Sequence, residues 1–202
     1  MGWARIRSRT MTFLNFHTHH SVLADEKAIV QGRDSWGIHP WHATETALLE
    51  FPPAHIKAIG ECGLDRVCNT PYELQLRVFM KHIEFSEQLQ LPLIIHCVKA
   101  IDDILLLHRK TKPSQPWIIH GFRGKPQQLQ SLISRGLYVS FGFRYHPQSI
   151  LECPLDRFFL ETDNDPAPIA LLYEKVALAR LTTPEELNRK IHENFKRIQV
   201  ND

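Results

Sequence analysis

Short runs of apolar residues recur along the chain, and stretches with helical spacing separate most of them. The runs are nearly continuous rather than alternating, which is typical of parallel strands that are buried on both faces. Ile, Val and Phe are frequent in them and Pro, Gly or Asp residues bound them, which favours strands over buried helices. The predicted strands cover residues 12–16, 28–30, 35–38, 56–60, 93–95, 117–119, 137–141 and 158–160.

Two helices carry clear start signals. The sequences TPYE at 70–73 and TPEE at 183–186 each place a Thr before a Pro and a Glu three residues after the Thr. This is the pattern of a capping box with Pro at the first helical position. Apolar residues then follow at the spacing of one helix face, at 76, 79, 80 and 83 and at 187, 191, 195 and 198. Weaker helical patterns cover residues 100–109, 126–135 and 169–181.

This alternation of strands and helices predicts an α/β fold with parallel strands. Eight candidate strands predict a (β/α)8 TIM-type barrel, and a compact one, because 202 residues is short for this architecture. Between His20 and Trp36 there is no room for two helices, so we expect the first crossover helices to be missing or replaced by loops. No internal repeat or linker divides the chain, which predicts a single domain over residues 11–202. Residues 1–10 are polar and basic, and we expect a disordered leader there, with translation starting at Met11.

Composition excludes several classes of protein. With 43% hydrophobic and 23% charged residues the chain resembles an ordinary globular protein, so wholesale disorder is excluded. Its net charge of +2 is too small for a protein that binds duplex DNA or a membrane through a broad positive surface. A local basic patch is still compatible with this charge. No apolar stretch approaches the roughly 18 residues that cross a bilayer, and no signal peptide is readable. The four cysteines form no CxxC pair. We therefore expect a cytoplasmic protein with no membrane and no obligate protein partner.

Histidines and acids recur where the predicted strands end. In a parallel barrel these ends face one mouth, where active sites form. The two side chains of His17-x-His19 leave the same face of a strand, so both can point at one ion. Imidazoles with carboxylates suit Zn, Mn, Fe, Co or Ni, and suit Mg where carboxylates and water dominate. The predicted metal ligands are His17, His19, Glu61, His96, His120 and Asp163.

Single members of this set have simpler interpretations, and only their joint placement favours a metal site. A lone histidine at a strand end is more often structural, and Glu161 or Asp163 alone could cap a helix. A carboxylate can bridge two cations about 3.5–4 Å apart, and Glu61, on a central strand, is the natural bridge. Asp163 can both ligate a metal and accept a proton from water, so Asp163 and Glu61 are the predicted catalytic residues. Glu161, two residues deeper on the same face, is expected to anchor a neighbour instead.

Other histidines and other catalytic arrangements are less informative. His39, after Gly37-Ile38, is intermediate, either near the site or structural. Surface or structural roles are favoured for the remaining seven histidines, at 20, 42, 55, 82, 108, 146 and 192. No GxSxG, P-loop or GxGxxG motif is present. Cys97 beside His96 is not a catalytic pair, because adjacent strand residues point to opposite faces.

Six ordered motifs resemble those of the TatD family: HTHH at 17–20, GIHP at 37–40, AIGECGLD at 58–65, PLIIHC at 92–97, HGF at 120–122 and LETD at 160–163. The similarity runs from Phe13 to near the C-terminus, where Asn194-Phe195 is similar to the closing motif. That family consists of metal-dependent hydrolases, many of them deoxyribonucleases, within the amidohydrolase-like barrels.

The resemblance implies a two-metal site. It implies His17, His19 and Asp163 around one metal, His96 and His120 around the second, Glu61 between them, and His39 near the substrate phosphate. The chain departs from the family pattern at Asn15, where an Asp is usual, in the short stretch before Trp36, at Arg66, and at Asn164-Asp165.

The expected function is that of a divalent-metal phosphodiesterase or deoxyribonuclease acting on DNA ends, with single-stranded DNA or a small phosphoester as substrate. Lys99, Arg123 and Lys125 follow strand ends and either meet phosphates or are ordinary solvated charges. Trp36 and Trp41 flank GIHP and could stack an unpaired base, although core burial is favoured for at least one of them. The alternatives are an amide or lactone hydrolase of the amidohydrolase type, and a metal-binding protein without enzymatic activity.

Overall fold

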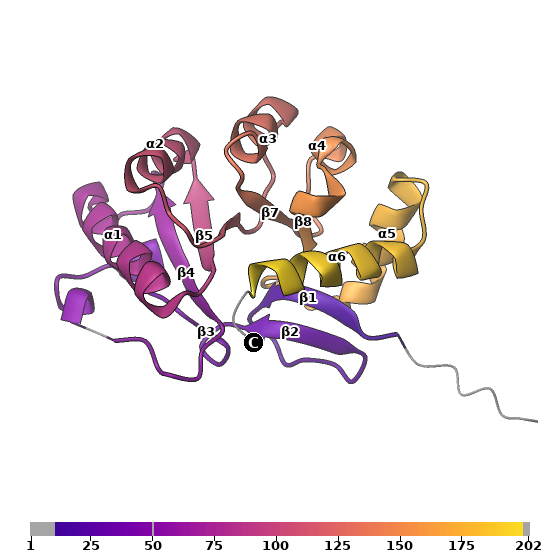
Figure 1. Cartoon of the computed structure of the whole chain (residues 1–202), viewed down its shortest axis with the longest axis horizontal. Coiled ribbons are helices and arrows are strands. Elements are labelled where there is room, and N and C mark those ends of the chain that lie inside the picture. Colours follow the sequence, from indigo (N-terminus) through magenta and orange to yellow (C-terminus); the bar gives the residue numbers. More distant parts are fainter. Residues whose placement is uncertain (1–10, 50, 200–202) are drawn as a thin grey trace, which may run out of the picture.

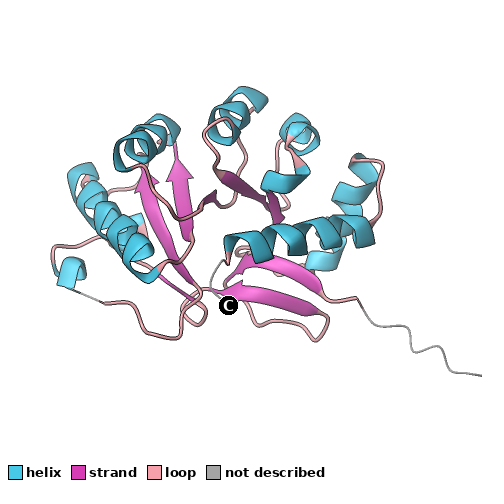
Figure 2. Cartoon of the chain, viewed as in Figure 1, coloured by secondary structure: helices cyan, strands magenta, loops and turns pink. Residues whose placement is uncertain are grey.

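The computed structural model describes residues 11–49 and 51–199 of the chain, so the predicted leader at 1–10 lies outside the described residues. Parallel strands lie at the centre, and helices form an arc around most of them, whereas the second and third strands lie at the edge without a helix outside them (Figures 1 and 2). The strands are β1 (Phe13–Thr18), β2 (Glu26–Val30), β3 (Ser35–Trp36), β4 (Ala58–Asp65), β5 (Leu93–Val98), β6 (Trp117–Ile119), β7 (Tyr138–Phe141) and β8 (Phe158–Leu160). Each corresponds to one predicted apolar run.

Six α-helices follow the later strands in the described part of the chain. They are α1 (Tyr72–Leu89), α2 (Ile101–Thr111), α3 (Pro126–Ile133), α4 (Pro147–Glu152), α5 (Ile169–Ala179) and α6 (Pro184–Ile198). Three short 3-10 helices are also present, η1 (Pro40–His42), η2 (Thr46–Leu49) and η3 (Leu155–Arg157). None of the described helices is both long and apolar enough to cross a membrane.

The strands form two parallel sheets. One has the order β3-β4-β5-β6-β7-β8 and the other pairs β1 with β2. Isolated bridges connect the two sheets, between Gln31 and Ser35 on one side and between Thr18 and Asp163 on the other. The predicted α/β class and the barrel order of eight parallel strands are confirmed, but the ladder around the described strands is interrupted at these two places.

Among the described residues, the connections before β4 contain no α-helix. Residues 19–25 join β1 to β2 and residues 31–34 join β2 to β3 as loops, as the lack of room before Trp36 predicts. The next connection, from β3 to β4, holds only η1 and η2 among its described residues. The early strands therefore have no helix of their own to cover them, and α6 lies across β1 instead (Figure 1).

The two predicted capping boxes differ in outcome. Thr183 caps α6, because its hydroxyl accepts the backbone N–H of Glu186 at 3.2 Å. Thr70 does not cap α1. The cap position is Pro71, and the Thr70 hydroxyl donates to the carbonyl of Trp41 at 3.0 Å. A tertiary contact thus takes the hydroxyl that the local pattern assigns to the helix. Helix α4 has only a short apolar pattern and was not predicted.

Side chains complete the edge of β1 that faces away from β2. Asn188 of α6 accepts the N–H of Leu14 at 3.1 Å and donates to the carbonyl of Thr12 at 2.8 Å. The Tyr173 hydroxyl of α5 donates to the carbonyl of Leu14 at 2.8 Å. Buried backbone groups need partners, and here helix side chains supply what a neighbouring strand would supply in a continuous ladder.

Asn15, the residue after Leu14 on β1, links the strand to the chain after β8 through its side chain. Its Oδ1 accepts the N–H of Thr162 at 3.0 Å and its Nδ2 donates to the Thr162 hydroxyl at 2.9 Å. The side chain that replaces the family's usual Asp therefore ties β1 to the segment after β8, next to Asp163.

We expect Asn188→Ala to lower the free energy of unfolding by about 1–3 kcal/mol, because it leaves the buried N–H of Leu14 without an acceptor. Urea denaturation followed by circular dichroism measures the change. Arg189→Ala, at the neighbouring exposed position of α6, is the control and should stay within about 0.5 kcal/mol. Equal effects of the two substitutions would show that Asn188 does not hold β1.

Candidate active site

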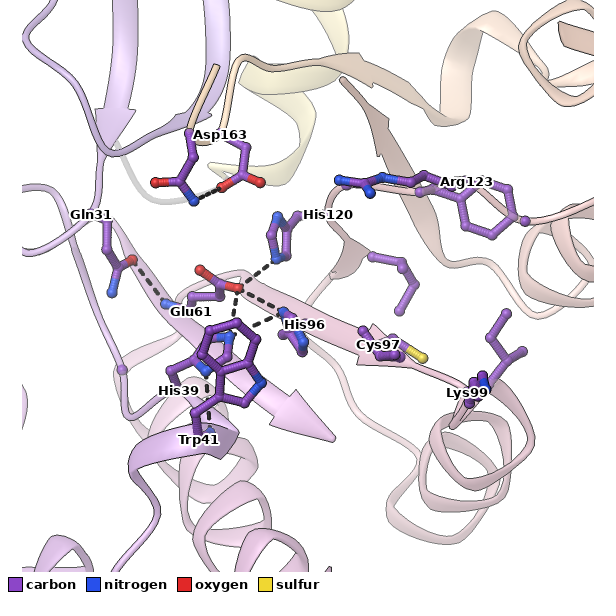
Figure 3. A pocket seen from close by; sticks show the side chains of 18 of the residues that line it. Gln31, His39, Trp41, Glu61, His96, Cys97, Lys99, His120, Arg123 and Asp163 are labelled. Carbon is purple, nitrogen blue, oxygen red and sulfur yellow. Dashed lines mark hydrogen bonds and ion pairs between the residues drawn. The ribbon is translucent and has the colours of Figure 1, made fainter. Parts of the chain in front are cut away.

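A cavity of about 1370 Å³ opens at the carboxyl ends of the strands (Figure 3). Five of the six predicted metal ligands line it, and the sixth, His17, is fully buried. His39, Lys99 and Arg123, the predicted substrate-binding residues, line it as well. Pockets for drug-sized ligands commonly occupy about 300–1,000 Å³, so this cavity is large enough for a ligand bigger than a single small molecule.

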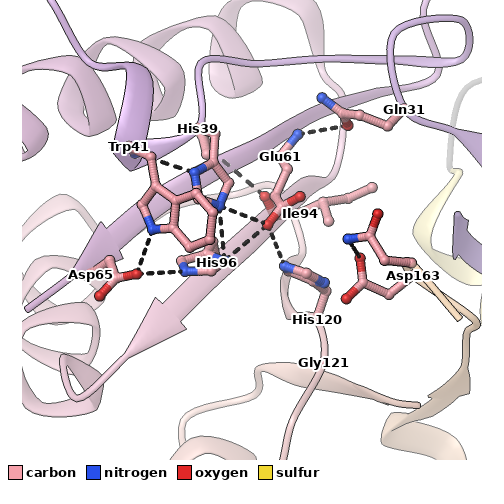
Figure 4. A network of polar contacts seen from close by, with 12 residues as sticks. Gln31, His39, Trp41, Glu61, Asp65, Ile94, His96, His120, Gly121 and Asp163 are labelled. Atoms are coloured by element: carbon pink, nitrogen blue, oxygen red, sulfur yellow. Dashed lines mark hydrogen bonds and ion pairs between the residues drawn. The ribbon is translucent and has the colours of Figure 1, made fainter. Parts of the chain in front are cut away.

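Glu61 is the centre of the site (Figure 4). It lies on β4 with 7% of its side chain exposed, and five histidines surround its carboxylate. Oε1 lies 2.7 Å from His120 Nε2, 2.9 Å from His96 Nδ1 and 3.2 Å from His39 Nε2. Oε2 lies 3.4 Å from His19 Nε2 and 3.5 Å from His17 Nε2. The strand-end argument thus selected side chains that converge on one carboxylate.

The close approach of β4 and β5 brings Glu61 to His96. A Cβ atom at Gly63 would lie 2.1 Å from the carbonyl oxygen of His96, and one at Gly60 would lie 2.5 Å from that of Ile94. Both glycines have positive φ angles, +139° at Gly63 and +140° at Gly60. Glycine is therefore required on either side of Glu61 for the two strands to lie this close.

His17, His19 and Asp163 form one group of possible ligands. Their nearest donor atoms all lie within 4.8 Å of one another, and His19 Nε2 is 3.5 Å from Asp163 Oδ1. The backbone holds Asp163 in place, since its N–H donates to the carbonyl of His17 and its carbonyl accepts the N–H of His19, both at 3.0 Å. Its φ of +54° lies in the left-handed region, which Asp tolerates better than most residues. Asp163 is thus clamped between the two histidines.

His39, Glu61 and His96 form a second group within the same 4.8 Å limit. His39 Nε2 lies 3.1 Å from His96 Nδ1. The resemblance implies His120 rather than His39 beside His96, and His120 is also in contact with Glu61 from the neighbouring strand end. Three imidazoles therefore surround Oε1 of Glu61, one more than a two-histidine site needs.

The charges of the site reinforce one another. Burial raises the pKa of the Glu61 carboxyl, but His120, with the nearby His17 and His19, outweighs it, so that this pKa lies far below its usual range. Burial lowers the pKa of His120, whereas Glu61 and Glu161 raise it, and the net shift is upward. The pKa of His19 is also raised, mainly by its contact with Glu61. The carboxylates thus favour positive charge at this place.

His17 tests whether a metal ion fits. It is completely buried, and neither of its ring nitrogens has a hydrogen-bond partner. Such a group is costly in a folded protein and calls for an explanation. A divalent ion bound to Nε2 would give that nitrogen a partner, because Glu61, His19 and Asp163 lie around the same point. Imidazoles with carboxylates are the donors that Zn, Mn, Fe, Co or Ni prefer, so the residues fit the metal that the resemblance implies.

Two further carboxylates hold the histidines from behind. Asp65 Oδ2 lies 3.3 Å from His96 Nε2. Glu161 Oε1 lies 3.2 Å from His120 Nδ1 and accepts the N–H of Gly121 at 2.6 Å. Glu161 therefore contacts a neighbouring histidine, in line with its expected anchoring role, whereas sequence reasoning missed Asp65. Its signal was present, since Glu61 and Asp65 are four residues apart on one face of a strand.

Tertiary contacts create the roles of two other residues: Gln31 was missed, whereas His82, for which a surface or structural role is favoured above, takes a structural one. Gln31, in the loop after β2, accepts the N–H of Glu61 through Oε1 at 2.9 Å. His82 of α1 accepts the N–H of Ile38 at 2.9 Å, and its Nδ1 lies 2.7 Å from the carbonyl of Val78. Burial lowers the pKa of His82 to about 4, so the ring is neutral and can accept this bond. His82 thus fixes the backbone next to His39.

Known proteins resemble this chain over most of its length. It is 29% identical to "3'-5' ssDNA/RNA exonuclease TatD" of Salmonella typhimurium, over 91% of this chain and 84% of that protein. It is also 29% identical to "Uncharacterized metal-dependent hydrolase YabD" of Bacillus subtilis, over 80% of this chain and 75% of that protein. The crystal structure of YJJV, a TatD homologue from Escherichia coli K12, matches with a TM-score of 0.72 over 89% of this chain and 79% of that chain. At 20% identity this match shows the shared fold.

The comparison with protein families agrees with the fold and with the six motifs. The model of the family described as "TatD related DNase" matches residues 10–199, nearly the whole chain. The chain therefore belongs to the TatD related DNase family and is a metal-dependent hydrolase.

Proposed function

We propose that this protein hydrolyses phosphodiester bonds at the ends of single-stranded DNA with two divalent metal ions. The observation that carries the proposal is the buried Glu61 carboxylate, which has histidines at both oxygens and His17 beside it without a hydrogen-bond partner. A bridging carboxylate is the usual centre of a two-metal phosphodiesterase site. The relatives named as ssDNA/RNA exonucleases support the choice of substrate.

The hydrogen bonds of the imidazoles support a division of roles. A neutral histidine that donates from one nitrogen presents the lone pair of the other. His120 Nδ1 faces Glu161 and His96 Nε2 faces Asp65, so His120 Nε2 and His96 Nδ1 can present lone pairs toward Glu61. His39 differs, because its Nδ1 accepts the N–H of Trp41 at 3.2 Å and its Nε2 therefore carries the proton.

We assign the ligands accordingly. His17, His19 and Asp163 would hold one ion, His96 and His120 the other, and Glu61 would lie between them. His39 would donate its Nε2 proton to a phosphate oxygen instead of binding a metal. The carboxylates behind His96 and His120 would orient these rings and make them better ligands.

The reaction then needs a base, an activated nucleophile and a neutralised phosphate. When bound, the two metal ions lower the pKa of a water molecule toward about 7 and polarise the phosphoryl oxygens. Asp163, with a quarter of its side chain exposed to the cavity, takes the proton of the attacking water. Its backbone clamp between His17 and His19 keeps that carboxylate in one position. His39, and the cavity-lining Lys99 and Arg123, would hold the phosphates of the strand.

One observation weighs against the amide or lactone hydrolase. Dinuclear amidohydrolases often bridge their metals with a carboxylated lysine on the fourth strand, and Glu61 takes that place here. Lys57 lies just before β4, and its ammonium group forms an ion pair with Asp34 at 3.0 Å. It does not line the cavity.

A substrate panel tests the proposed function. Protein stripped with EDTA and reloaded with Mg²⁺, Mn²⁺, Zn²⁺, Co²⁺ or Ni²⁺ should shorten end-labelled single-stranded DNA stepwise and cleave p-nitrophenyl phosphodiesters. We expect no turnover of amides or lactones, and no activity while EDTA is present. Turnover of an amide or lactone without any phosphodiester cleavage would replace the proposal by its alternative.

We expect Asp163→Asn to lower the turnover number by about 10²- to 10⁴-fold, because the amide keeps the shape and one ligating oxygen but accepts no proton. Metal analysis should find much of the metal still bound. Glu161→Gln keeps an oxygen for the N–H of Gly121 and should cost less. Near wild-type turnover of metal-loaded Asp163→Asn would leave Asp163 as a ligand only, and the base would lie elsewhere.

Replacing Lys99 and Arg123 together by Ala should weaken oligonucleotide binding equally for all sequences. Neither side chain forms an ion pair within the described residues, so both charges are free to meet phosphates. In fluorescence anisotropy titrations in EDTA at several salt concentrations, the slope of log K against log[salt] should fall by about 1 for each lost contact. Lys110→Ala, on the exposed end of α2, is the control. An unchanged slope would mean that the two charges are ordinary solvated ones.

A further inference from the structure

Trp41 is an exposed aromatic residue that is held rigidly. Its side chain is 58% exposed, on η1 at the rim of the cavity (Figure 3). Its indole N–H donates to Asp65 Oδ2 at 2.7 Å, its backbone N–H donates to His39 Nδ1 at 3.2 Å, and its carbonyl accepts the Thr70 hydroxyl at 3.0 Å. Trp36, on the other side of GIHP, is instead partly buried and packs against His82 and Phe85. The two tryptophans therefore have different roles.

Space adjoins Trp41 on more than one side. It lines the large cavity and also a smaller hollow of about 280 Å³, which Val67, Cys68, Asn69 and Thr70 complete. The rings nearest to the indole are steeply inclined to it, by 80° for His39 and 75° for His96. Among the described residues no ring is stacked parallel on Trp41. The position for a flat ligand is thus vacant.

Rigidity makes this position useful for binding. A ligand that stacks on a fixed indole does not have to order that side chain, so less of the contact energy is lost. The ring centroids of Trp41 and His39 are 4.7 Å apart, so a stacked group would lie beside the histidine that we assign to the phosphate. Asp65 also contacts His96, so one carboxylate fixes both the indole and a metal-ligating ring (Figure 4).

We propose that Trp41 is a stacking platform for one unpaired base of the strand, next to the phosphate that is cleaved. This inference rests on the proposed nuclease function and extends it to how the substrate is selected. Every base has a π-face, so such a platform accepts any sequence. Inside a duplex both faces of a base are covered by its neighbours, so stacking on Trp41 favours an unpaired nucleotide over an internal base pair.

Binding measurements without turnover test the platform. Fluorescence anisotropy in EDTA compares wild-type protein, Trp41→Leu and Trp41→Phe on two single-stranded deoxyoligonucleotides, one ordinary and one with abasic nucleotides at both ends. On the ordinary strand Trp41→Leu should bind roughly 5- to 100-fold more weakly, the usual effect of losing one base–aromatic stack, and Trp41→Phe should lose less. On the abasic strand wild type and Trp41→Leu should bind alike.

Phe51→Leu is the matched control, because Phe51 is 78% exposed but lines neither hollow. It should bind both strands as wild type does. An ordinary strand bound equally by wild type and Trp41→Leu would overturn the platform. An equal loss on both strands would also overturn it, and would indicate that Trp41 acts through Asp65. In both cases cleavage of DNA by the wild type would leave the proposed function standing. A wild type that neither binds nor cleaves oligonucleotides would remove both.

Discussion

The site depends on one buried carboxylate. Glu61 lies in the interior with five imidazoles around its two oxygens, and a buried charge is stable in a protein only when opposite charge or hydrogen bonds compensate it. Removing any one of those partners therefore disturbs the rest. Glycines on either side of Glu61 let β4 approach β5, and Gln31 holds its backbone N–H. The strands are arranged so that this carboxylate and its histidines meet.

The short connections after β1 and β2 change how β1 is supported. Where a longer barrel protein has room for crossover helices, residues 19–25 and 31–34 are loops. β1 carries His17 and leads into His19. Hydrogen bonds with Asn188, Tyr173 and Thr162 hold this strand in place. An isolated backbone bridge between Thr18 and Asp163 joins β1 to the segment that follows β8. The candidate ligands His17, His19 and Asp163 thus lie where the ladder is interrupted.

Much of this arrangement could be predicted from the sequence, because strand ends in a parallel barrel face one way. The apolar runs predict all eight strands, and the convergence of the six ligand candidates follows from that rule. Contacts between residues that are far apart in the sequence could not be predicted in this way. Thr70 has a perfect local signal for capping α1 but donates to Trp41, and Gln31 reaches Glu61 only because the loop after β2 is short. Asp65 could have been found, since it shares a strand face with Glu61 and sits at the same strand end.

The weak overall charge constrains how a nucleic acid can be held. With a net charge of +2 the protein lacks the broad positive surface that tracks a duplex, and the cavity offers Lys99 and Arg123, which form no ion pair with any residue that the structure describes. On the proposed function, binding then has to come from a few local contacts: the metal ions at the reacting phosphate, His39 beside it, and one stacked base. Such contacts hold a strand by its end rather than along its length. A rigid indole next to the phosphate site would therefore contribute a larger share of the binding energy in this protein than in a strongly basic one.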